Sequence, residues 1–305
     1  MSIQGAHVLI TGASSGIGLE TAKALGAKGA KLTLFARREA PLEALKADIE
    51  ALGGEALVVV GDVTRQGDRQ RLLAEGRAHF GPIDILINNA GRADQGLTSA
   101  LDLSDQGALK EMMALNFEAP LALTQGALPA MVDANRGIII NLLTHAIFHG
   151  FALTPGYVAA KSALHGATLN LRYELVDTDV RVLGVYPGLV DTEFSRAMVP
   201  EGSSTADLML YMRHFRAGQR GSSEFKRIEK PMKPAAVAEA IVAGIEDETC
   251  EHIFPDDHHR TSAAKMWENP GWWREESTAF YTAFLPPLRE LMGRLMELAK
   301  AARAG

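Results

Sequence analysis

Short runs of apolar residues recur along the chain, and longer stretches between them have apolar residues at every third or fourth position. The runs are rich in Val, Ile and Leu, which is typical of strands buried on both faces of a sheet. Strands are predicted at residues 7–11, 31–36, 56–61, 83–88, 137–143, 180–186 and 251–254. Helices are predicted at residues 17–28, 39–52, 67–80, about 104–132, about 157–177 and 234–247. Strands that alternate with helices indicate an α/β fold whose parallel sheet is covered on both sides.

Two regions depart from this alternation. Residues 188–233 lack a strong period, and we expect a long loop with short helices that forms a lid over the substrate. Residues 256–305 are expected to form a helical C-terminal extension of a domain at 1–255. Apolar residues at helical spacing between 286 and 305 predict an amphipathic helix that packs on its own subunit or on a partner.

The composition adds constraints on partners and compartment. The chain has 305 residues, of which 47% are hydrophobic and 22% charged, and a formal net charge of -6. This balance gives no indication of nucleic acid or an anionic membrane as a partner. Cys250 is the single cysteine and cannot form an internal disulfide, so we expect a reducing, cytoplasmic location. We expect no signal peptide, and the apolar runs are too short to span a bilayer.

The sequence "TGASSGIG" (11–18) lies between the first predicted strand and the first predicted helix. Glycines in such a loop let the backbone turn tightly and approach a pyrophosphate, to which the helix N-terminus offers amide donors. We therefore expect a dinucleotide to contact the loop. The residues involved would be Gly12, Ser14, Ser15, Gly16, Ile17 and Gly18.

Further motifs occur in register with this loop: "NNAG" (88–91), Asn116, "YVAAK" (157–161) and "PGLVDT" (187–192). Together they resemble the short-chain dehydrogenase/reductase family over roughly residues 5–255. The resemblance implies a doubly wound Rossmann fold, a nicotinamide cofactor, and hydride transfer at a carbonyl or alcohol carbon. It also implies a homodimer or homotetramer that pairs through the two long helices.

The end of the second predicted strand bears on the choice of cofactor. NAD-binding domains usually place an acidic residue there, which binds the ribose 2′-hydroxyl. Here Ala36 is followed by Arg37 and Arg38, whose guanidinium groups could bind a 2′-phosphate. In the family, an arginine at position 37 accompanies NADP. We expect NADP(H) to be preferred and NAD(H) to be possible, unless both arginines are only solvated residues at a helix start.

The resemblance implies roles for other residues around the cofactor. Asp62 and Val63 resemble the pair that flanks the adenine, and Asn89 resembles the residue that braces the central strand. The segment that follows the sixth strand resembles the one that holds the nicotinamide carboxamide. Its candidate residues are Pro187, Gly188, Val190 and Thr192, although Pro-Gly also marks ordinary strand-end turns.

Tyr157 and Lys161 are four positions apart, so their side chains share one face of a helix. A tyrosine with its ordinary pKa of about 10 is a poor base at neutral pH, and a nearby positive charge lowers that pKa. Tyr157 would protonate a carbonyl oxygen in reduction and accept the alcohol proton in oxidation. The family implies that Lys161 also binds the nicotinamide ribose, and that Asn116 holds a water that relays protons to it.

The family normally places a serine 13 residues before the tyrosine, and this chain has Thr144 there. Threonine keeps the hydroxyl that would polarise the substrate oxygen, but it adds a methyl group. We assign Thr144 the role of the serine. Thr154 is three residues before Tyr157 and is expected to start or cap the helix.

The substrate side of the site is less defined. Several apolar and aromatic side chains could line a roomy pocket, although each is more often ordinary packing. They are His145, Phe148, His149, Leu153, Tyr186, Phe194, Met198, Met209, Met212 and Phe215. The lid carries more basic than acidic residues at 211–233, which could receive an anion or be a solvated face. No metal is expected, because adjacent residues such as "DDHH" (256–259) cannot easily converge on one ion.

These observations predict an NADP(H)-dependent oxidoreductase for a bulky, largely apolar ketone or secondary alcohol. One alternative is an NAD-dependent dehydrogenase of aryl or steroid-like alcohols. A second alternative is a nucleotide-sensing binding protein without turnover, which the intact Tyr157, Lys161 and Asn116 disfavour.

Overall fold

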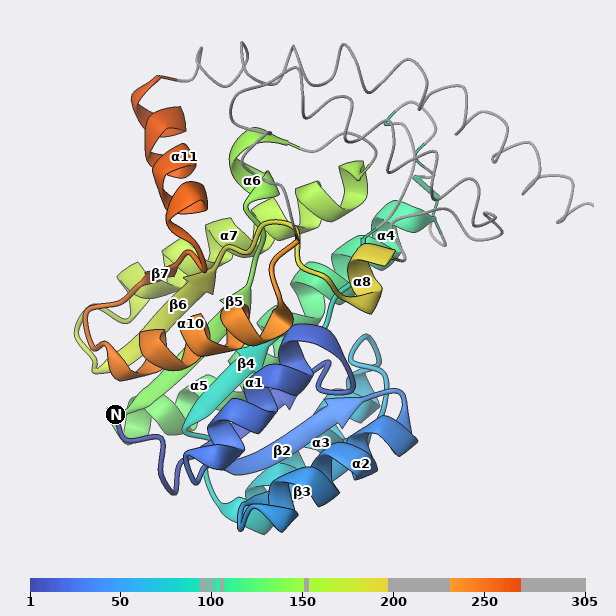
Figure 1. Cartoon of the computed structure of the whole chain (residues 1–305), viewed down its shortest axis with the longest axis vertical. Helices are drawn as coiled ribbons and strands as arrows, with labels where there is room; N and C mark the ends of the chain where they lie inside the picture. The colour runs from blue at the N-terminus through green and yellow to red at the C-terminus, as the bar shows by residue number, and fades with distance from the viewer. Residues whose placement is uncertain are drawn as a thin grey trace, which may run out of the picture.

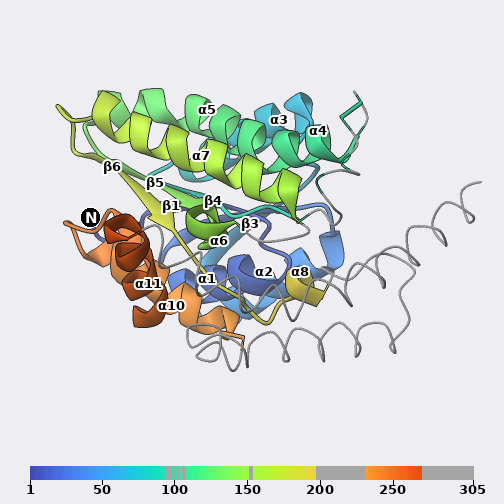
Figure 2. The same cartoon turned by 90° about the horizontal axis from the view of Figure 1, so that it is seen from above.

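A computed structural model of the chain describes residues 1–93, 98, 101, 103–104, 107–150, 154–196 and 231–269. Within these ranges a parallel sheet lies between two layers of helices (Figures 1 and 2). Its strands are β1 (His7–Thr11), β2 (Lys31–Ala36), β3 (Glu55–Val60), β4 (Ile85–Asn88), β5 (Gly137–Leu142), β6 (Val180–Val185) and β7 (His252–Ile253). They are ordered β3-β2-β1-β4-β5-β6-β7, and every pair is parallel. The predicted doubly wound Rossmann fold is confirmed.

The helices divide between the two faces of the sheet (Figure 2). One layer contains α3 (Gln66–Phe80), α4 (Ala108–Met113), α5 (Ala119–Asp133) and α7 (Pro155–Glu174). The other contains α1 (Gly16–Ala27), α2 (Glu39–Ala51) and α10 (Pro234–Glu246). Short helices α6 (Ala146–His149) and α8 (Glu193–Arg196) follow β5 and β6, and α11 (Asp257–Glu268) follows β7 and lies near α6.

Both faces of the sheet are buried, as the continuous apolar strands predict. In β1, Val8 and Ile10 belong to the cluster that includes residues of α1 and α10, whereas Leu9 belongs to the cluster with residues of α3 and α5. All three side chains are fully buried. Since neighbouring side chains of a strand point to opposite faces, a central strand must be apolar at every position to be covered twice.

The strand order sets the place of the site. The chain runs outward from β1 to β3 and then returns to the middle of the sheet at β4. Ligands of such sheets bind at the carboxyl ends of the strands, beside the point where the order reverses. The glycine loop follows β1, "NAG" (89–91) follows β4, Thr144 follows β5 and Pro187 follows β6. The topology therefore gathers all the sequence motifs at one edge of the sheet.

The structure departs from the predicted elements in two places. The long helix predicted at about 104–132 begins at Ala108 and is interrupted by a π-helical turn, η2 (Ala114–Glu118). The last strand has two residues where four were predicted, at 251–254. Most of the predicted lid and of the predicted tail helix lie outside the described residues.

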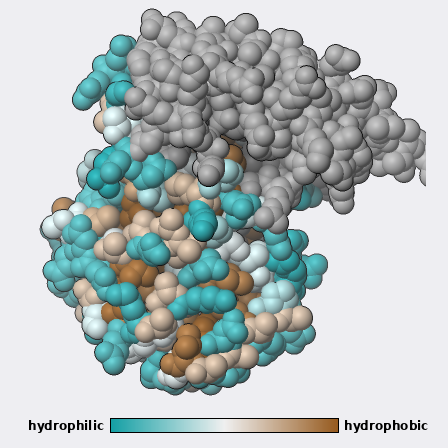
Figure 3. Space-filling view, viewed as in Figure 1, coloured by the Kyte–Doolittle hydropathy of each residue, from teal (hydrophilic) through white to brown (hydrophobic). Residues whose placement is uncertain are grey.

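On the face shown in Figure 3, hydrophobic residues reach the surface in small patches between hydrophilic ones, as on many globular proteins. No helix in the described part of the chain has the length and apolar character needed to cross a membrane.

Candidate active site

The glycine loop that joins β1 to α1 has the backbone shape that only glycine adopts readily. Gly12 and Gly16 have φ angles of 69° and 57°. At Gly18 an added methyl group would lie 2.5 Å from the carbonyl oxygen of Gly12, so any side chain there would push the loop apart. Ser15 is the N-cap residue of α1 and makes no side-chain capping bond. The loop thus brings the start of α1 close to the end of β1, as a pyrophosphate cradle requires.

Asn89 fixes this loop to the end of β4. Its side-chain Nδ2 donates to the carbonyl oxygens of Thr11, at 2.8 Å, and Gly12, at 3.2 Å. In return, the hydroxyl of Thr11 accepts from the backbone amides of Asn89 and Ala90. Sequence reasoning gave Asn89 a bracing role but missed Thr11. In the sequence, Thr11 is marked only as a hydroxyl-bearing residue at the last position of a predicted strand.

The two arginines after β2 have different neighbours. Nη2 of Arg38 is 3.2 Å from the hydroxyl oxygen of Ser14, in the glycine loop, and 2.9 Å from Oε2 of Glu193, in α8. Arg37 faces Asp62, after β3, and interacts with its carboxylate. Glu193 was not among the residues that the sequence singled out.

Asp62 is held in a tight turn. Its Oδ1 accepts hydrogen bonds from the backbone amide of Thr64, at 2.9 Å, and from the Thr64 hydroxyl, at 2.8 Å. Partial burial raises the pKa of Asp62. The two hydrogen bonds and the charges of Arg37 and Arg65 lower it by more, so the pKa of Asp62 lies below its ordinary value. Val63 is buried beside it, in the same cluster as Phe35.

The hydroxyl of Thr144 lies beside the phenol of Tyr157 and favours its ionised form. Thr144 lies two residues after β5 and is 8% exposed, and Tyr157 lies in the first turn of α7. The ring of Phe194, in α8, packs against the ring of Tyr157 with centroids 5.5 Å apart. Thr154 is the N-cap residue of α7 but makes no side-chain capping bond, so the expected capping by its hydroxyl is not found.

Lys161 is buried one helical turn beyond Tyr157, and its ammonium donates to the carbonyl oxygen of Leu142 at 2.6 Å. Burial lowers the pKa of Lys161 to about 7. Burial also raises the pKa of Tyr157 to about 12, against a smaller lowering by the Thr144 hydroxyl. The sequence predicted a lowered pKa for the phenol next to a positive charge. Removal of the phenol from water raises it instead.

Asn116 occupies the centre of η2, where the helix between α4 and α5 widens. Its Nδ2 donates to the carbonyl oxygens of Arg92, at 3.0 Å, and Met112, at 3.2 Å. Its Oδ1 is buried and has no hydrogen-bond partner within the described ranges. A π-helical turn often marks a functional position, because it turns one side chain and its neighbours away from the regular helical face.

The segment after β6 contacts both the residues after β5 and the glycine loop. The carbonyl oxygen of Pro187 accepts from the amide of His145, and Val190 pairs with Met232. Thr192 approaches the loop so closely that a methyl group added at Gly16 would lie 3.0 Å from its Cγ2. The hydroxyl of Thr192 donates to the carbonyl oxygen of Val190 at 3.4 Å. Gly188 lies in the same segment, which thus passes between the glycine loop and the residues after β5.

Part of the predicted substrate wall proves to be core. Tyr186 has no exposed surface and stacks on Phe254, with centroids 5.0 Å apart, and it also packs against Phe148. A side chain without exposed surface cannot line an open pocket, so the prediction for Tyr186 is wrong. The remaining wall candidates outside the described residues are Leu153, Met198, Met209, Met212 and Phe215. Nor do the described residues contain a cluster of three metal-binding side chains.

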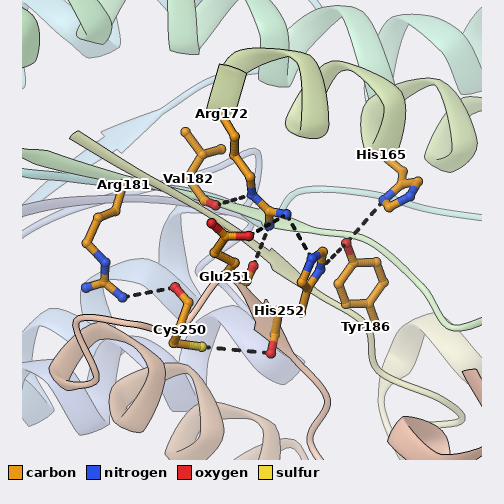
Figure 4. Close-up of polar contacts among 8 residues, drawn as sticks. All are labelled: His165, Arg172, Arg181, Val182, Tyr186, Cys250, Glu251 and His252. Carbon is orange, nitrogen blue, oxygen red and sulfur yellow. Dashed lines mark hydrogen bonds and ion pairs between the residues drawn. The ribbon is translucent and has the colours of Figure 1, made fainter. Parts of the chain in front are cut away.

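A polar network between α7 and the ends of β6 and β7 was not predicted (Figure 4). Nη1 of Arg172 is 3.0 Å from Nε2 of His252, and the hydroxyl of Tyr186 is 3.1 Å from Nδ1 of both His252 and His165. Since arginine can only donate, Nε2 of His252 accepts and its Nδ1 donates to Tyr186, whose hydroxyl donates to His165. His165 is four residues beyond Lys161, so the network ties α7 to β6 and β7.

Comparison with known proteins bears on this geometry. The model for the short chain dehydrogenase family matches residues 6–202. An uncharacterized oxidoreductase from Staphylococcus epidermidis is 34% identical over 67% of this chain and 88% of its own. The NADP-dependent 3-hydroxy acid dehydrogenase of Schizosaccharomyces pombe is 33% identical over 79% of this chain and 86% of its own.

Solved structures agree on the fold. A Sinorhizobium meliloti protein described as a short-chain alcohol dehydrogenase superposes with a TM-score of 0.71 and 26% identity, over 85% of this chain and 97% of its own. An alcohol dehydrogenase from Thermococcus sibiricus, solved with 5-hydroxy-NADP, gives a TM-score of 0.65 and 23% identity, over 81% of this chain and 94% of its own. This chain therefore belongs to the short-chain dehydrogenase family of NAD(P)-dependent oxidoreductases.

Proposed function

We propose that the protein uses NADP(H) to interconvert a bulky, largely apolar ketone and the corresponding secondary alcohol. The observation that carries this proposal is the position of the Thr144 hydroxyl beside the phenol of Tyr157. Two neighbouring hydroxyls, one after β5 and one in the first turn of α7, can both turn to a single substrate oxygen. The catalytic residues of the domain at 1–255 would be Asn116, Thr144, Tyr157 and Lys161.

The division of labour among these residues follows from their surroundings. The raised pKa of Tyr157 keeps the phenol protonated at neutral pH, which suits a proton donor in ketone reduction. Thr144 donates a second hydrogen bond to the substrate oxygen as negative charge builds on it. Lys161 would return a proton to Tyr157, and the Oδ1 of Asn116, which has no partner among the described residues, would hold a water that passes the proton from solvent to Lys161.

Residues around the glycine loop fit a dinucleotide with a 2′-phosphate. The loop is shaped by Gly12, Gly16 and Gly18, and the two guanidinium groups after β2 offer charge-assisted hydrogen bonds to a phosphate. The relative from S. pombe is named for its dependence on NADP. Bound NADP(H) would supply or accept the hydride and, when oxidised, would place a positive ring beside Tyr157.

The apolar surroundings of Tyr157 favour a largely apolar substrate. Phe194 packs on the phenol ring, with centroids 5.5 Å apart. Burial of apolar substrate surface against such rings is the main source of affinity in small-molecule pockets.

A substrate screen tests the proposal. The purified protein should oxidise NADPH in the presence of at least some aromatic or long-chain ketones, and faster than it oxidises NADH. Tyr157→Phe should abolish this consumption while the variant still binds NADPH. Tight NADPH binding without turnover of any ketone or alcohol would instead favour a nucleotide sensor, and preference for NADH would favour the NAD-dependent alternative.

A further inference from the structure

Arg38 and Glu193 form an ion pair that bridges two loops far apart in the sequence. Arg38 follows β2 and Glu193 begins α8, after β6, and Nη2 of the arginine is 2.9 Å from Oε2 of the glutamate. The same Nη2 is 3.2 Å from the hydroxyl oxygen of Ser14 in the glycine loop. The side chains of Arg38 and Glu193 are 49% and 62% exposed, so an incoming ligand can reach both.

The residues on either side of Glu193 hold it in this position. Thr192 packs against Gly16 in the glycine loop, and Phe194 packs against the ring of Tyr157. The carboxylate is therefore presented to Arg38 by a short segment that is fixed at two points. This anchoring distinguishes the pair from a chance contact between two mobile surface side chains.

A carboxylate and a phosphate compete for the same guanidinium group, because both are oxyanions that accept its N–H groups. In this structure Glu193 holds the Nη2 group of Arg38, which the proposed function assigns to the cofactor 2′-phosphate. We propose that Glu193 is an internal competitor for Arg38 that a 2′-phosphate must displace. It thereby lowers the affinity for NADP(H) and leaves that for NAD(H) unchanged. This inference rests on the proposed preference for NADP(H).

The size of the effect follows from the exposure of the pair. Exposed ion pairs are weak, so their loss gives roughly a two- to five-fold gain in affinity for the competing anion. The gain is confined to ligands that carry the 2′-phosphate, since a dinucleotide with a free 2′-hydroxyl does not need Arg38. Glu193 thus sets how strongly the protein discriminates between the two cofactors, without contacting the reacting atoms.

The test measures binding of two fragments to the full chain by calorimetry, so it does not depend on a known substrate. Adenosine 2′,5′-bisphosphate carries the 2′-phosphate, and 5′-AMP differs from it only by lacking that group. Glu193→Gln should bind the bisphosphate two- to five-fold more tightly than wild type and bind 5′-AMP equally well. Glu39→Gln is the matched control, because Glu39 follows Arg38 directly and forms no ion pair within the described residues.

A double-variant comparison separates direct competition from a general effect of charge. In an Arg38→Ala background, Glu193→Gln should no longer tighten binding of the bisphosphate. An equal gain in that background, or in Glu39→Gln, would show that only the net charge matters and would overturn the proposal. The proposal would also be overturned if Glu193→Gln bound the bisphosphate no more tightly than wild type does, while wild type binds the bisphosphate more tightly than the fragment without the 2′-phosphate. If wild type binds both fragments alike, the proposed NADP(H) preference has failed and the competitor falls with it.

Discussion

The side-chain oxygen of Asn116 and the ammonium nitrogen of Lys161 approach the same face of Gly91. A methyl group added at Gly91 would lie 2.7 Å from Oδ1 of Asn116 and 3.5 Å from Nζ of Lys161. The absence of a side chain at Gly91, the residue that ends the "NAG" turn after β4, thus leaves space into which both buried polar groups reach. The geometry links the π-helical turn, α7 and the end of a central strand at one point.

Gly91→Ala should therefore lower turnover more than it lowers cofactor affinity. The new methyl group would displace the amide of Asn116, and a shift of about 1 Å in a catalytic arrangement can reduce turnover by up to about 100-fold. Steady-state kcat and the Kd for NADPH measure the two effects. Gly67→Ala is the control, because a methyl group at Gly67, in α3, meets no atom within 4 Å. Full turnover in Gly91→Ala would exclude Asn116 from the proton path.

Thr144→Val should reduce turnover by about 10²–10³-fold, with NADPH affinity retained. The change removes the hydroxyl beside Tyr157 but keeps the volume, and a lost donor to a developing oxyanion typically has this effect. Thr144→Ser keeps the hydroxyl and should stay active, and the space left by the methyl group should admit larger ketones. A comparison of kcat and KM for the two variants checks both points. Wild-type turnover in Thr144→Val would reduce position 144 to packing.

The sheet was predictable because burial on both faces leaves a direct mark on the sequence. The run at 7–11 coincides with β1 (His7–Thr11), and the alternation of strands with helices predicted a parallel sheet covered on both faces. The gathering of Thr144, Tyr157 and the glycine loop at one edge is a consequence of that parallel order.

The features that the sequence did not predict arise from tertiary contacts. The π-helical turn around Asn116 leaves the apolar periodicity almost unchanged, so no local signal marks it. Tyr186 is an aromatic residue of the kind that often lines pockets. Its neighbours His252, in β7, and Phe254, which follows β7, lie far along the chain, so the sequence around Tyr186 does not reveal that it is buried. The pair of Arg38 and Glu193 likewise joins residues that only the fold brings together.

Stability should fall as the pH drops below about 6.5, because histidines in the fold resist protonation. Burial lowers the pKa of His7, and burial and the charge of Arg172 lower the pKa values of His165 and His252. Below pH 6.5 the unfolded chain therefore binds more protons than the folded chain, and the free energy of unfolding decreases. Above pH 6.5 the three histidines make their full contribution to the free energy of unfolding.

Urea unfolding at pH 7.5 and pH 5.5 measures this loss. His252→Asn removes one titrating ring, so the variant should be less stable at pH 7.5 but should lose less on acidification. Asp62 and Asp68, whose pKa values are also lowered, lose their contribution only near and below their ordinary value of 3.8, outside this interval. An equal loss in wild type and variant would remove His252 from the explanation.

Tyr173→Glu should reduce the size of the assembly. The family resemblance implies pairing through α5 and α7, and the C-terminal ends of these helices expose Val132, Tyr173 and Val176, which are 39%, 80% and 76% exposed. A charge placed in a buried helix interface is destabilising, since it loses its hydration without gaining a partner. Analytical ultracentrifugation should show a dimer or tetramer for wild type and a smaller species for the variant. Leu52→Glu is the control, because Leu52, at the end of α2, is 75% exposed and lies in the opposite helix layer. A monomeric wild type, or the same dissociation in both variants, would exclude pairing through α5 and α7.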